Sequence, residues 1–160
     1  GGAEATITPP LATELLVQSL PKPPEGWTAT TPVESKQPVP LPDGTRSEVT
    51  RLESEYVKGG DAVKNVKISI TDTRGIPALL LFIESYEESA GESGYRKKMD
   101  AGGAPAWLTY AFGPNREADG TGSVTLIYRQ RFHIQLDGGT GVSASDLTNL
   151  VSSFNFDALK

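Results

Sequence analysis

The sequence predicts an α+β fold in which helices pack on a mostly antiparallel, twisted sheet, as a two- or three-layer sandwich. Three features of the 160 residues predict it. Two neighbouring segments alternate apolar and polar residues with a period of two, as strands with one face in water do. The other strand-like segments are not separated by regular helices, which favours antiparallel pairing. The C-terminal segment carries the apolar stripe of an amphipathic helix.

The N-terminal part of the chain divides into a leader and the start of a domain. Residues 1–23 are predicted to be a flexible leader, because prolines stand at both ends of a short leucine-rich stretch. A short helix over residues 11–20 is the one regular element expected there. Residues 24–160 are predicted to be a single domain. Its first strand runs from Trp27 to Val33, and a proline-rich loop over 34–46 follows.

The clearest strand pair is a hairpin between residues 50–57 and 65–71. The linker Lys58-Gly59-Gly60-Asp61 is polar and rich in glycine, which suits a hairpin turn. The alternation places one set of side chains toward the core, namely Leu52, Tyr56, Val66, Ile68 and Ile70. The intervening polar residues, among them Glu53 and Glu55, are therefore expected to face water.

Residues 76–88 are predicted to form a buried helix. Apolar residues recur here at helical spacing, and Pro77 suits the first turn of a helix. Further strands are predicted over 95–99 and 106–112, and over 123–136 as one long strand or two joined by a bulge. The final helix is predicted to begin at Ser143 or Ser145 and to bury Leu147, Leu150, Val151 and Phe154.

Composition excludes several classes of protein. The net charge of −5 is dispersed along the chain, which argues against a nucleic-acid partner. The absence of cysteine removes disulfides, thiolate-bound zinc, iron–sulfur clusters and thiol nucleophiles. No apolar run reaches the roughly 18 to 20 residues that span a bilayer. The start Gly1-Gly2-Ala3-Glu4 suggests that a leader, with or without a lipid-bearing Cys, has been removed, and mass spectrometry of the protein in its host tests this hypothesis.

His133 is the only histidine and the first candidate for chemistry. The alternation from Val124 onward places it on the outer, polar side of its strand, with Arg129, Arg131 and Gln135. A catalytic role would need a partner, and Glu53 or Glu55 on the predicted hairpin are the candidates. No Gly-x-Ser-x-Gly turn and no pair of metal-binding histidines is present, so we expect neither a metal nor a cofactor.

Two further groups of residues are candidate ligand-binding sites. Trp27 and Trp107, with Tyr110, would line an apolar pocket beside the glycine-rich segment 102–106; alternatively, both tryptophans fill the core. Arg129 and Arg131, with Lys67, would form a basic patch for a carboxylate or phosphate; alternatively, they pair across strands with Glu53 and Glu55.

The order of elements resembles the PsbP-like fold group, which includes a photosystem II extrinsic protein and small bacterial envelope lipoproteins. The likeness rests on Pro24-Glu25-Gly26-Trp27 before the first strand, the hairpin, the segment 76–88, and the strand Arg131–Leu136 leading to the helix at 146–156. It covers residues 24–156. It implies export and a role in binding or assembly rather than catalysis, and no site motif matches from which residue roles follow.

These observations favour a monomeric, non-catalytic binding or accessory domain of the bacterial cell envelope, periplasmic or secreted. The sequence does not identify its ligand or protein partner. Two alternatives stay open. One is a hydrolase-like or ligand-modifying enzyme that uses His133 with Glu53 or Glu55. The other is a structural protein-interaction domain that docks through the helix at residues 11–20.

Overall fold

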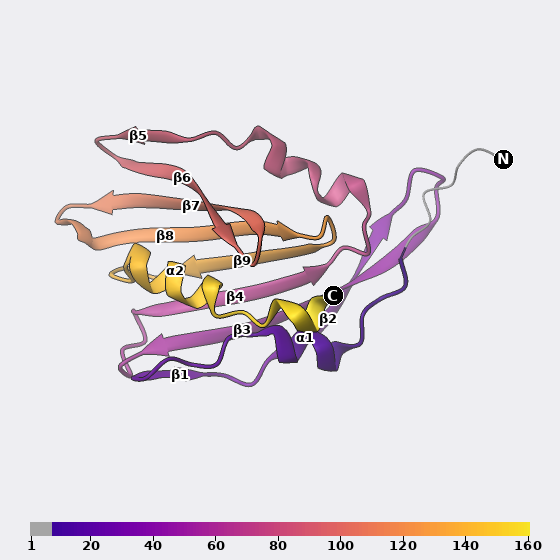
Figure 1. The fold of residues 1–160 in the computed structure, drawn as a ribbon, viewed down its shortest axis with the longest axis horizontal. Coiled ribbons are helices and arrows are strands. Elements are labelled where there is room, and N and C mark those ends of the chain that lie inside the picture. Colours follow the sequence, from indigo (N-terminus) through magenta and orange to yellow (C-terminus); the bar gives the residue numbers. More distant parts are fainter. Residues whose placement is uncertain (1–7) are drawn as a thin grey trace.

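The structure, a computed structural model, describes residues 8–160, so residues 1–7 of the expected leader lie outside the described part. One nine-stranded sheet runs through the molecule and all its paired strands are antiparallel (Figure 1). The predicted α+β class with a mostly antiparallel sheet is confirmed. The strands are β1 (Trp27–Ala29), β2 (Val33–Pro40), β3 (Arg46–Lys58), β4 (Asn65–Asp72), β5 (Ser89–Gly91), β6 (Gly94–Ala101), β7 (Ala104–Gly113), β8 (Arg116–Tyr128) and β9 (Phe132–Gly138).

The strand order is β1-β3-β4-β9-β8-β7-β6-β5, and β2 shares the β3 edge with β1. The predicted hairpin is confirmed as β3–β4, with Leu52 opposite Ile70. The predicted loop over 34–46 is largely wrong, because residues 33–40 form β2. This strand contains Pro38 and Pro40, which an edge strand tolerates because one side of it needs no hydrogen-bond donors.

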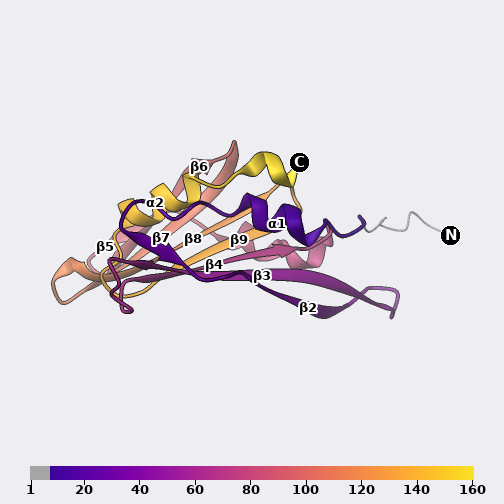
Figure 2. The ribbon, with the colours of Figure 1, turned by 90° about the horizontal axis from the view of Figure 1, so that it is seen from below.

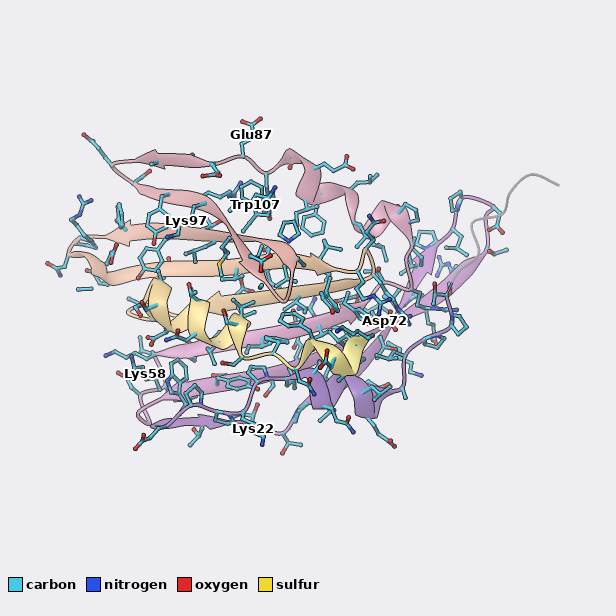
Figure 3. All side chains as sticks on the ribbon, viewed as in Figure 1. Lys22, Lys58, Asp72, Glu87, Lys97 and Trp107 are labelled. Carbon is cyan, nitrogen blue, oxygen red and sulfur yellow. The ribbon has the colours of Figure 1, made fainter. Side chains whose placement is uncertain are left out.

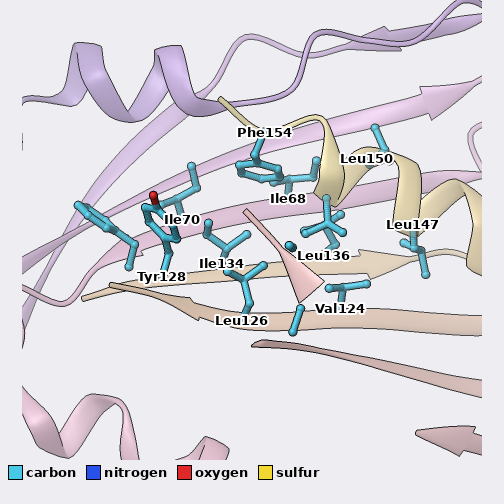
Figure 4. Packing of buried hydrophobic residues seen from close by; sticks show 14 of the residues in the cluster. Ile68, Ile70, Val124, Leu126, Tyr128, Ile134, Leu136, Leu147, Leu150 and Phe154 are labelled. Carbon is cyan, nitrogen blue, oxygen red and sulfur yellow. The ribbon is translucent and has the colours of Figure 1, made fainter. Parts of the chain in front are cut away.

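The helices lie on one face of the sheet, which we call the inner face (Figure 2). They are α1 (Thr13–Ser19), α2 (Ala144–Ser152) and the 3-10 turn η3 (Phe156–Leu159). Their apolar side chains meet those of the central strands to form the core (Figure 4). Its members include Leu16, Leu52, Ile68, Ile70, Leu126, Ile134, Leu136, Leu147, Leu150 and Phe154, each at most 5 % exposed. No helix in the described part has the length and hydropathy needed to cross a membrane.

Helix α2 begins at the predicted cap Ser143. The Ser143 hydroxyl accepts a hydrogen bond from the Asp146 amide at 3.0 Å, and the Asp146 carboxylate accepts one from the Ser143 amide at 3.3 Å. This capping box satisfies amides at the helix start that have no partner within the helix. Asp146 also binds the Lys58 ammonium at 3.0 Å, which ties the start of α2 to the end of β3.

The prediction of a buried helix over 76–88 is wrong. Two short 3-10 turns stand there, η1 (Pro77–Leu79) and η2 (Leu81–Ser85), and neither buries a residue. The connection from β4 must pass four other strands to reach β5, about 24 Å at 4.8 Å per strand spacing. A helix of this length would rise only about 20 Å. The chain therefore crosses in more extended turns.

Residues 123–136 form two strands rather than one. The chain reverses through a three-residue loop at 129–131, and Tyr128 lies opposite Phe132. Arg129 and Gln130 have φ values of 53° and 51°, in the left-handed region. The loop keeps the alternation in phase, so the side chains that alternate with the outward-facing ones, such as Tyr128 before the loop and Phe132 after it, are buried.

The N-terminal segment packs against the domain from residue 8 onward. The Leu11 amide donates to the Asp72 carboxylate at 2.8 Å, and the Arg131 guanidinium donates to the Pro9 carbonyl at 2.8 Å. Helix α1 lies within the stretch predicted as a short helix, and its Leu16 is fully buried. This helix therefore contributes Leu16 to the protein's own core, while Val17 remains 40 % exposed.

Candidate functional site on the outer face of the sheet

The face of the sheet opposite the helices, which we call the outer face, is crossed by the chain that links β4 to β5. We call residues 73–88 the crossover segment. The Phe82 ring lies 4.9 Å from the ring of His133 on β9, and the Tyr86 ring lies 6.0 Å from that of Trp107 on β7. Phe82 and Tyr86 are themselves 6.1 Å apart, centroid to centroid. These four residues form a continuous aromatic band across three neighbouring strands.

Cationic side chains flank this band near the β6 edge. The Arg96 guanidinium lies 4.2 Å from the Tyr86 ring centre, and the Lys98 ammonium lies 5.8 Å from that of Trp107. Both contacts are within the range of cation–π attraction. The contacts of Tyr86 with Arg96 and with Trp107 hold the end of the crossover segment against the sheet.

His133 sits beneath the crossover segment in a hydrogen-bonded row. Its Nε2 lies 3.3 Å from Gln135 Oε1, which also accepts from the Thr125 hydroxyl, and Gln135 Nε2 donates to Asp137 at 3.0 Å. An amide oxygen only accepts, so the neutral ring carries its proton on Nε2. Burial lowers the pKa of His133 and nearby Arg51 lowers it further, against the opposing effects of Gln135 and Asp137. The ring is therefore predominantly neutral at pH 7.

The register does not bring His133 together with Glu53 or Glu55. His133 lies opposite Thr71, and Thr71 lies opposite Arg51, so the nearest β3 side chain in its row is basic. Both glutamates lie two strands away, about 10 Å at 4.8 Å per spacing, and in other rows. Within residues 8–160 no three metal-ligating side chains converge. His133 and the two glutamates thus do not have the convergent geometry of an acid–base pair.

A shallow hollow of about 290 Å³ lies on the outer face beside β2 and β3. Ser69 lies there, a small residue between Glu53 and Gln135 in the register. The charges around it largely compensate each other: Arg51 binds Glu53 at 2.7 Å, and the Asn65 amide donates to Glu55 at 3.1 Å. Because both partners of the Arg51–Glu53 pair are well exposed, this surface resembles an ordinary solvated sheet face.

The six residues predicted to bind a ligand lie in different parts of the molecule. Trp107 and His133 belong to the aromatic band. Trp27 is on β1, five strands from the β7 that carries Trp107, and the Lys58 ammonium lies 5.9 Å from its ring centre. Lys58 and Trp107 lie well apart in Figure 3. The Tyr110 ring is 1 % exposed on the inner face, where its hydroxyl donates to the Val142 carbonyl at 3.0 Å. The expected Trp27–Trp107–Tyr110 pocket is therefore not formed.

The two predicted arginines also separate. Arg129 is exposed in the loop between β8 and β9. Arg131 binds Asp72 with Nε at 2.7 Å and Nη2 at 2.9 Å, so its charge is neutralised by a buried carboxylate. Lys67 lies between Glu55 and Asp137 in the register, near the opposite end of β9 from the Arg129 loop. These residues do not make a basic patch. The glycine-rich segment expected beside a pocket is the β6–β7 turn, packed on Phe156.

Phe82 and Tyr86 were missed as site residues by sequence reasoning. Their spacing is compatible with a helix, which made residues 76–88 look like a core element. The available signal was composition: five apolar residues run consecutively from Leu79 to Ile83, with no polar face between them. Comparison with protein-family models, curated proteins and solved structures found no match for this chain.

Proposed function

We propose that this protein is a non-catalytic interaction module that docks on a protein partner through its crossover segment. The observation that carries the proposal is the exposure of its most apolar stretch. Leu81 is 56 % exposed and Phe82 37 % exposed, although both belong to the run from Leu79 to Ile83. Exposed apolar side chains that adjoin an aromatic band are typical of a protein-binding surface.

The charges beside this surface favour a protein over a membrane. Glu84, Glu87 and Glu88 follow the apolar run and are exposed. Carboxylates in this position would be repelled by the anionic lipids of a bilayer surface. They complement a partner that presents basic side chains around an apolar centre, and such charged rims increase association rates.

Two expectations from the sequence are carried forward as part of this proposal. The resemblance to the PsbP-like group supports an exported accessory role in the bacterial cell envelope, with or without a lipid anchor upstream. The helices on the inner face and the crossover segment on the outer face would together form a three-layer arrangement. Detection of the untagged protein in the envelope fraction of its host would support the location, and its recovery with cytosolic markers would contradict it.

The docking surface is tested with a double substitution, Leu81→Ser with Phe82→Ser, and a matched control. Val63→Ser is the control, because Val63 is 60 % exposed in the β3–β4 loop, away from the crossover segment. Proteins captured from envelope extract by the wild type are identified, purified and titrated against all three proteins. The double variant is expected to bind at least tenfold more weakly, since losing apolar anchors costs about 2 kcal/mol or more.

The outcome that contradicts the proposal is equally defined. A purified partner that binds the double variant and the wild type with the same affinity would show that Leu81 and Phe82 are not the contact. Circular dichroism of both variants establishes that they fold, so weaker binding is not a consequence of unfolding. Loss of binding in the Val63→Ser control would also count against a contact specific to the crossover segment.

A further inference from the structure

The edge of the sheet at β6 is only partly covered. Strand β5 pairs with Gly94, Tyr95 and Arg96, the first three of the eight residues of β6. Within the described residues, no strand pairs with residues 97–101 on the side that faces away from β7. An edge of this kind presents unpaired backbone N–H and C=O groups to which an extended peptide can add as a further strand.

β5 begins only at Ser89 because the chain before it is held on the outer face. Tyr86 packs on Trp107 and under Arg96, which draws residues 86–88 out of the line of the strand. A hollow of about 530 Å³ lies along the β5–β6 pair and reaches Glu88 and Lys97, where the two strands diverge. An incoming strand opposite residues 97–100 would continue the line of β5.

The positive charges along this edge favour an added strand that carries acidic residues. Lys97 and Lys98 are both exposed, and alternation directs one to each face of the sheet. Within residues 8–160 neither forms an ion pair with a carboxylate; their ammonium groups lie over the rings of Tyr95 and Trp107. Asp100 is the one acidic residue further along the edge. Adjacent acidic residues in the added strand would lie opposite the two lysines.

The chain's own sequence shows which pattern fits. If the pairing of Ser89 with Arg96 were continued, Glu88 would lie opposite Lys97 and Glu87 opposite Lys98. In the structure neither glutamate pairs with β6, so the positions opposite Lys97 and Lys98 have no strand partner. A second copy of β6 is disfavoured as occupant, because antiparallel self-pairing would bring the lysines of the two copies together.

We propose that the open edge of β6 at residues 97–100 binds an extended segment of a partner protein that carries two adjacent acidic residues, as an added antiparallel strand. This inference rests on the proposed interaction function only for its premise that the partner is a protein. It concerns a surface distinct from Leu81 and Phe82. An acidic strand here and an apolar contact on the crossover segment would hold one partner at two places.

The probe is the fluorescein-labelled peptide Thr-Val-Glu-Glu-Val-Thr, titrated by anisotropy and followed by amide shifts in NMR spectra of the whole protein. Binding is expected to shift the amides of residues 97–100 and to weaken as salt rises. Lys97→Glu with Lys98→Glu is expected to weaken it by about fivefold or more, and to favour the peptide with Lys-Lys at its centre. N-methylation of alternate peptide amides is expected to abolish binding, because an added strand needs those donors.

The controls separate this proposal from the docking function. The Leu81→Ser, Phe82→Ser double variant is expected to bind the peptide as the wild type does. No binding at about 1 mM peptide, binding that survives N-methylation at every amide, or shifts confined to other strands would each overturn the proposal. Protection from hydrogen exchange, without peptide, of the amides in residues 97–100 that point away from β7 would also overturn it, since that would show that the chain's own residues already pair with this edge.

Discussion

The carboxylate of Asp72 at the end of β4 is fully buried and is bound at both oxygens by the guanidinium of Arg131, at 2.7 and 2.9 Å. The same carboxylate accepts hydrogen bonds from the backbone amides of Leu11, at 2.8 Å, and Arg74, at 3.0 Å. Four donors from three separate stretches of the chain thus converge on one side chain. This contact joins the N-terminal segment, the crossover segment and the β8–β9 loop.

Removing one partner of this pair is predicted to be far more costly than removing a surface charge. Asp72→Ala leaves the Arg131 charge and two amides without their acceptor, and a loss of about 3 to 5 kcal/mol in the free energy of unfolding is expected. Arg129→Ala in the exposed loop is the control, with an expected change within about 0.5 kcal/mol. Urea titration followed by tryptophan fluorescence measures both. Similar midpoints for the two variants would contradict a central role for Asp72.

The pH dependence of stability is predicted to contain a contribution from His133. Because its pKa in the folded protein lies below the ordinary value of 6.5, the unfolded chain binds a proton more readily there. The contribution is fully present above about pH 6.5 and is lost as the pH falls through the lower folded-state pKa. Urea midpoints between pH 8 and pH 4.5 should therefore fall less steeply for His133→Phe. Parallel curves for the variant and the wild type would show that burial under Phe82 does not perturb this ring.

The β6–β7 turn offers a matched pair of substitutions. Gly102 and Gly103 both have positive φ, at 62° and 83°, so alanine strains the backbone at either position. A Cβ on Gly102 would also meet the Phe156 ring at 2.4 Å, whereas one on Gly103 would meet nothing within 4 Å. Gly103→Ala is expected to cost about 1 kcal/mol and Gly102→Ala about 1 to 3 kcal/mol more. Equal thermal midpoints would show that Phe156 moves aside freely.

Much of the sheet could be predicted from the sequence because period-two alternation is a local property of a half-exposed strand. The hairpin around Gly59 and the buried phase of residues 124–136 followed directly from it. The chain reversal at Arg129 and Gln130 could not be predicted, since neither is a residue type that usually adopts positive φ. The turn is imposed by the pairing of Tyr128 with Phe132 and by tertiary contacts such as that of Arg131 with Asp72.

The candidate site was less predictable than the sheet, because it depends on contacts between distant segments. Phase alone placed His133 on the outer face, yet only the path of the crossover segment brings Phe82 onto it. Helical spacing in residues 76–88 was misleading, since it describes a possible apolar face and not the distance the chain must cover. The order of the strands decides which strand edges have no partner, as at Lys97. That order does not follow from the pattern of any single segment.

The strand order has a consequence during synthesis on the ribosome. β4 lies between β3, its immediate predecessor, and β9, the last strand to be made, so one of its edges has no partner until nearly the whole chain has emerged. That strand carries Val66, Ile68 and Ile70, and an unpaired apolar edge is prone to intermolecular pairing. Nascent chains halted before residue 132 should therefore need chaperone protection that the finished chain does not.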